Sequence, residues 1–147
     1  MLDGLFVTPA VTAITDALAS ARATDGIIVV VGHAKLAQAL KEKRDVVAVG
    51  LSPRAAKKLG STADTTAMDA KSVAAVIGID IANNETWAAT LGEWTRVVRD
   101  GGAVVLVDKG KPEETSRRAL CAGLTEIEQR HAGSRIITSG LVTHFEE

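Results

Sequence analysis

The stretch LGEWTRVVRDGGAVVLVD, which spans residues 91–108, carries the strongest fold signal in the sequence. Four apolar residues at steps of four, three and four lie on one helical face: Trp87, Leu91, Trp94 and Val98. This spacing predicts an amphipathic helix that runs to about Arg99. The Gly101–Gly102 pair predicts the end of the helix, and the apolar run Ala103–Val107 predicts a strand buried on both faces.

The same alternation of helices and strands extends along the whole chain. Further strands are predicted at 27–31, 46–49 and 73–80, and further helices at 8–25, 33–45, 52–59 and 112–122. Residues 61–70 are ambiguous between a short strand and a loop. Segments 124–130 and 134–142 predict an antiparallel hairpin. The predicted fold is therefore one α/β domain over residues 1–147. It has a Rossmann-like, mostly parallel sheet, helices on both faces and a C-terminal antiparallel β-hairpin.

The composition argues against a nucleic-acid-binding, disulfide-bonded, metal-binding or membrane protein. The net charge is −1, aromatic residues make up 3% and tyrosine is absent, so neither a basic nucleic-acid face nor a base-stacking platform is expected. The single cysteine, Cys121, excludes an internal disulfide and is expected to be a buried, inert thiol. We expect no metal site, no membrane contact and a cytoplasmic location, since no leader or long apolar run occurs.

Three stretches resemble the class I S-adenosylmethionine-dependent methyltransferases. These are VVAVGLSPRAAKKL (46–59), LGEWTRVVRDGGAVVLVD (91–108) and LCAGLTEIEQRHAGSRIITSGLV (120–142). The resemblance implies parallel strands with an antiparallel seventh strand inserted beside the fifth. The segments RVVRDGGAVVLV and LCAGL are also similar to the methyltransferase-like N-terminal domain of anamorsin, which lacks the cofactor motif. That similarity is an analogy, and the only role it implies for this chain is that of a scaffold.

The residues that the family uses to hold its cofactor are largely replaced in this sequence. The acid near the end of the family's first strand aligns with Val30, and its glycine-rich turn is shortened around Gly32 and His33. The acid that binds the ribose hydroxyls falls on Gly50, beside Leu51. Losing two charged hydrogen-bonding groups removes about 3–6 kcal/mol of binding free energy, which corresponds to a factor of at least a hundred in affinity.

Other acids are candidates for compensating contacts. The family's acid near the adenine amino group is matched by Asp64 or Asp69. Asp80 follows a predicted strand and is either a polar contact, a general base or a cap for the next helix. His33 and Lys35 lie where a strand enters a helix, and such helix starts attract anions, but two exposed side chains in a shortened turn are the favoured interpretation.

The remaining distinctive residues have simpler interpretations. Trp87 and Trp94 share their stripe with aliphatic residues, so core packing is favoured over a ligand pocket. His131 and His144 have no partner at metal-ligand spacing and are expected to be exposed. Four arginines are expected on solvated helix faces beside acidic neighbours: Arg96, Arg99, Arg117 and Arg118.

The first functional hypothesis is a non-catalytic pseudo-methyltransferase that takes no cofactor and acts as a scaffold or interaction module. Its partner is another protein or a second copy, docked on the hairpin edge or on the apolar residues Leu2, Leu5, Phe6 and Val7. The alternatives are an active methyltransferase with atypical S-adenosylmethionine contacts, or a binder of a small anionic ligand in the same cleft. Methyl transfer depends largely on holding donor and acceptor in line, so no nucleophile is required.

Overall fold

A computed structural model describes residues 11–19, 26–31, 34–41, 45–49, 69–79, 85–109, 111–132 and 135–143. Residues 11–19 are helical. The other elements, in chain order, are β1 (Ile28–Val31), α2 (Ala34–Lys41), β2 (Val46–Val49), β3 (Val73–Ile79), α4 (Trp87–Val97), β4 (Val98–Lys109), α5 (Pro112–Cys121), β5 (Thr125–Ala132) and β6 (Arg135–Leu141). The helices predicted to start at residues 8 and 52, and the segment 61–70, lie wholly or partly outside the described residues.

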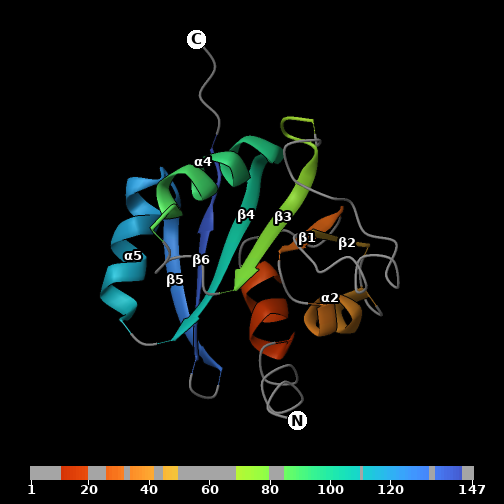
Figure 1. The fold of residues 1–147 in the computed structure, drawn as a ribbon, viewed down its shortest axis with the longest axis horizontal. Helices are drawn as coiled ribbons and strands as arrows, with labels where there is room; N and C mark the ends of the chain where they lie inside the picture. Colours follow the sequence, from red (N-terminus) through yellow and green to blue (C-terminus); the bar gives the residue numbers. More distant parts are fainter. Residues whose placement is uncertain are drawn as a thin grey trace.

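The described strands form one six-stranded sheet in the order β2-β1-β3-β4-β6-β5 (Figure 1). The first four strands in this order are mutually parallel, and β6 pairs antiparallel with both β4 and β5. The mostly parallel sheet and the C-terminal hairpin are therefore confirmed, as is the insertion of the last strand beside β4.

Helices cover both faces of the sheet, because the strands bury side chains on both faces. One core packs Val30, Ile77 and Val105 against residues 11–19 and α2. The other packs Val104 and Leu106 against α4 and α5. In Figure 1, α5 lies near β5 and β6, whereas α2 lies near β1 and β2. None of the helices within the described ranges has both the length and the apolar character that crossing a bilayer requires.

The boundary between α4 and β4 differs from the prediction. The helix ends at Val97, and Val98 already pairs with Val73 of β3. The next paired residues are Ala103 and Ala75, so residues 99–102 form a bulge on β4. Val98 was assigned to the helix because its side chain continues the apolar stripe, and the first residue of β4 buries its side chain in the same core.

Candidate functional site

The order of the strands creates a reversal point between β1 and β3. From β1 the chain moves outward to β2, then returns across β1 to place β3 on its other side. All three strands run parallel, so their carboxyl ends, at Val31 and Ile79 for the central pair, meet at one edge. In open α/β sheets the ligand crevice lies outside the carboxyl ends of the strands at such a reversal. This edge is therefore the candidate site.

Val30 is the one predicted cleft position that the structure describes at this edge. Its side chain is fully buried in the core that residues 11–19 and α2 cover. It supplies no charge or hydrogen-bonding group to a ligand. The predicted positions Gly32, His33, Gly50, Leu51, Asp64 and Asp80 lie outside the described residues, and their roles stay predictions.

The start of α2 supplies the positive side of the site. The helix begins at Ala34, three residues after the end of β1, and no acid lies in its first turn. Lys35 in that turn is exposed. The dipole of a helix favours an anion at its N-terminal end. This part of the edge therefore suits a carboxylate or phosphate group.

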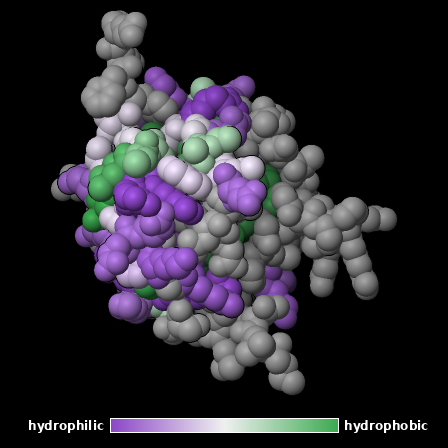
Figure 2. Space-filling view, turned by 60° about the vertical axis from the view of Figure 1, so that its left-hand side comes forward, coloured by the Kyte–Doolittle hydropathy of each residue, from purple (hydrophilic) through white to green (hydrophobic). Residues whose placement is uncertain are grey.

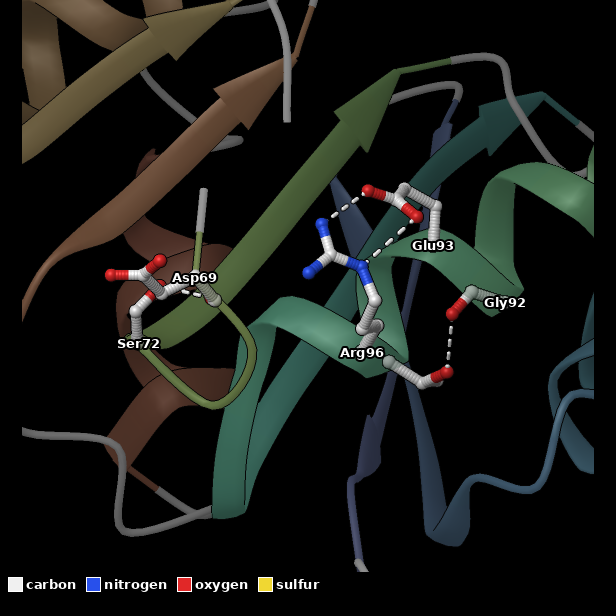
Figure 3. A network of polar contacts seen from close by, with 6 residues as sticks. Asp69, Ser72, Gly92, Glu93 and Arg96 are labelled. Atoms are coloured by element: carbon white, nitrogen blue, oxygen red, sulfur yellow. Dashed lines mark hydrogen bonds and ion pairs between the residues drawn. The ribbon is translucent and has the colours of Figure 1, made fainter. Parts of the chain in front are cut away.

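Asp69 is not at this edge, and its assignment to the cleft is corrected. It lies in the turn before β3, where its carbonyl oxygen accepts a hydrogen bond of 2.7 Å from the Ser72 hydroxyl. Figure 3 shows Asp69 at the beginning of β3, on the side where α4 ends, close to Arg96. Because β3 has 7 residues, about 20 Å separate its two ends. The hydrogen bond to Glu93 is the main cause of a raised Arg96 pKa, and the negative charge of Asp69 adds a smaller contribution in the same direction.

Asp108 is a carboxylate at the correct edge that the sequence reasoning missed. It is the penultimate residue of β4, and it is 1% exposed. Because side chains alternate along a strand, Asp108 lies on the same face as Leu106, the face that α5 covers. Its position directly after the buried run Ala103–Val107 was a usable signal, since a residue that ends a parallel strand lies at the carboxyl edge.

The two tryptophans pack as expected. Trp94 is 2% exposed, and Trp87 packs against the same core with part of its ring accessible. The guanidinium of Arg118 lies over that ring, 5.3 Å from its centroid. This cation–π contact joins α5 to the start of α4. Trp87 therefore combines core packing with one surface contact to a charged group.

Arg96, Arg117 and Arg118 lie on helices beside acidic neighbours, as predicted, but the prediction is wrong for Arg99, which lies in β4 because α4 already ends at Val97. Arg96 Nη2 lies 2.6 Å from Glu93 Oε1 on α4 (Figure 3). On α5, Glu114 Oε1 lies 2.6 Å from Arg117 Nη2 and 3.1 Å from Arg118 Nη2. The hydrogen bond from Arg117 lowers the pKa of Glu114, so this carboxylate is ionised at neutral pH. These ion pairs lie on partly solvated helix faces.

Cys121 is exposed, which contradicts the expectation of a buried thiol. On α5, Thr115 and Ala119 face the core, and Cys121 follows Ala119 by two positions. Two residues correspond to about 200° of helical rotation, so the thiol lies on the opposite side. His131 is exposed, as expected, whereas His144 lies outside the described residues. The described residues contain no group of three or more His, Cys, Asp or Glu that is placed to hold a metal ion.

No family model matches the sequence, and neither does any curated protein. Solved structures match the fold. A methyltransferase of Haloferax volcanii, solved in complex with the Trm112 methyltransferase activator, is 16% identical, with a TM-score of 0.71 over 91% of this chain and 90% of that one. A S-adenosylmethionine-dependent methyltransferase of Thermotoga maritima is 15% identical, with a TM-score of 0.66 over 87% and 89%. A 16S rRNA N2 methyltransferase of T. thermophilus, in complex with AdoMet and guanosine, is 16% identical, with a TM-score of 0.62 over 81% and 36%.

The chain therefore has the Rossmann-like class I methyltransferase fold. One prediction, that the chain takes no cofactor, is contradicted. Neighbours with this fold are S-adenosylmethionine-dependent methyltransferases, and one of them was solved with AdoMet. The prediction rested on the acids missing at Val30 and Gly50. Losing such side chains weakens individual contacts, but it leaves the reversal of the sheet between β1 and β3 in place.

Proposed function

We propose that this chain is a methyltransferase-type domain that binds S-adenosylmethionine at the carboxyl ends of β1 and β3. The observation that carries the proposal is the reversal of strand order between these two parallel strands, which creates a ligand crevice in folds of this kind. The solved neighbours that are named for this cofactor support it. When bound, the cofactor supplies an electrophilic methyl group on a sulfonium.

The residues at this edge fit one end of the cofactor better than the other. The start of α2, with Lys35 and no acid in its first turn, suits the carboxylate of the methionine moiety. Val30 offers no acid to the ammonium group, and Gly50 offers none to the ribose hydroxyls. We therefore expect weak binding, with a dissociation constant that is raised about a hundredfold or more over a site with both acids.

The test is a calorimetric titration with S-adenosylmethionine and S-adenosylhomocysteine. We expect saturable but weak binding to the wild type. Gly50→Asp supplies a carboxylate at the family's ribose-binding position, and one charged hydrogen-bonding group gives a gain of about tenfold or more. Gly92→Asp is the matched control, because Gly92 lies on α4 with open space around it. Absence of saturable binding in both the wild type and Gly50→Asp overturns the proposal.

A second candidate function is a protein-interaction module that does not transfer methyl groups. Two observations favour it: the apolar Val30 at the cofactor edge, and the Haloferax volcanii neighbour, which was solved with an activator protein. A methyl-transfer assay on the purified chain separates the two functions, and light scattering measures whether the chain forms a homodimer. Methyl transfer by the isolated chain rules out the second function, whereas cofactor binding without transfer to any acceptor tested favours it.

A further inference from the structure

A basic pocket lies beside the proposed cofactor edge, over the end of β4 and the first turns of α5. Its volume is about 850 Å³, and it is lined by Lys109, Lys111, Glu113, Glu114, Arg117 and Arg118. Figure 2, which turns the left-hand side of Figure 1 forward, shows hydrophilic side chains gathered over this face of the molecule. A small-molecule site typically occupies 300–1,000 Å³, so the pocket is large enough for one ligand.

The charges in the pocket are unbalanced. Its four cationic and two anionic side chains leave a formal charge of +2. Glu114 is already engaged, because it pairs with both Arg117 and Arg118. No ion pair in the described part of the chain involves Lys109 or Lys111. The two lysines therefore provide the available positive charge, and the Glu114 pairs hold the two guanidinium groups in place beside them.

We propose that this pocket binds a small molecule that carries a phosphate monoester. Such a group has a charge between −1.5 and −2 at neutral pH, which matches the surplus in the pocket. Lysine binds phosphate as a mobile point charge, and arginine binds it through a planar pair of donors. Arg118, which lines the pocket on α5, also contacts Trp87 at the start of α4. The pocket is therefore connected to both α4 and α5. The proposal does not depend on the cofactor, because it needs no residue of the β1 edge.

The test follows backbone amide resonances while inorganic phosphate, or glycerol phosphate, is added without S-adenosylmethionine. We expect saturable shifts at residues 109–118, with glycerol phosphate binding at least as tightly as inorganic phosphate. Adding sodium chloride weakens binding, because salt screens exposed charges. Absence of saturable shifts in this segment, or equal shifts with chloride at the same ionic strength, overturns the proposal.

Charge variants give effects of opposite sign. Lys109→Gln and Lys111→Asn each remove one positive charge and weaken phosphate binding roughly fivefold to tenfold. Asparagine is chosen for Lys111 because the residue has a φ of 47°, which asparagine tolerates. Glu113→Gln raises the surplus charge and tightens binding. Lys41→Gln, at the end of α2, is the matched control and leaves binding unchanged. Equal weakening in Lys41→Gln contradicts the proposal.

Discussion

Replacing Gly102 by alanine gives a direct test of the packing at the β4 bulge. A Cβ atom at this position would lie 2.5 Å from the Ala74 carbonyl oxygen and 2.5 Å from Val98 Cγ1. Real Cβ contacts are never this short, and the carbonyl belongs to the backbone of β3, so the two strands must move apart. Overpacking of this kind costs about 1–3 kcal/mol. Because the closest atom is backbone, we expect about 3 kcal/mol for Gly102→Ala, with a melting temperature lowered by roughly 6–12 °C.

Gly92→Ala is the matched control, because a Cβ atom there meets nothing within 4 Å and the residue lies inside α4. Alanine favours the helix over glycine, so this variant is expected to gain about 1 kcal/mol. Urea unfolding, followed by the fluorescence of the buried Trp94, measures both free energies. A Gly102→Ala protein that unfolds at the wild-type midpoint with an unchanged m-value refutes the argument, because the bulge would then accommodate a methyl group.

Two further predictions concern α5. The hydrogen bond from Arg117 lowers the Glu114 pKa below its ordinary value of 4.5, so its contribution to stability is present above that value and is lost as the pH falls further. Glu114→Gln should therefore be less stable than the wild type near neutral pH in urea unfolding, and the difference should shrink as the pH falls below 4.5; a difference that does not change with pH contradicts the prediction. The exposed Cys121 thiol should react with a thiol reagent in the native protein nearly as fast as in urea, and a much slower native reaction contradicts its exposure.

Most of the fold could be predicted because two periodicities dominate the sequence. Continuous β-branched runs such as Ile28–Val31 favour burial on both faces, and apolar stripes at helical spacing require helices to cover them. The prediction was wrong at the boundary between α4 and β4, because the core on that face of the sheet contains side chains from both the helix and the strand. The side chain of Val98 fits both the apolar stripe of the helix and the buried pattern of the strand. Its pairing with Val73 assigns it to the strand.

The candidate site was harder to predict, because the spacing of residues along the chain does not indicate whether a residue lies at the edge where the strands begin or at the edge where they end. Asp69 precedes β3 and Asp108 ends β4, so the two carboxylates belong to opposite edges. A simple rule separates them: in a parallel sheet, residues after strands meet at one edge and residues before strands meet at the other. The pocket beside α5 had no sequence signal, because its cations come from the end of a strand, from the residue that precedes α5 and from one turn of that helix.

The position of β6 has a consequence for the synthesis of the protein. This strand follows every other described strand in the sequence, yet it lies between β4 and β5 in the sheet. While the nascent chain emerges, β5 appears before the strand that it pairs with, and one edge of β4 stays open. That edge belongs to a strand with the buried run Ala103–Val107, which is a template for intermolecular pairing. Release of residues 135–141 from the ribosome is therefore the step that ends this exposure, and chaperones that shield β-edges should act before it.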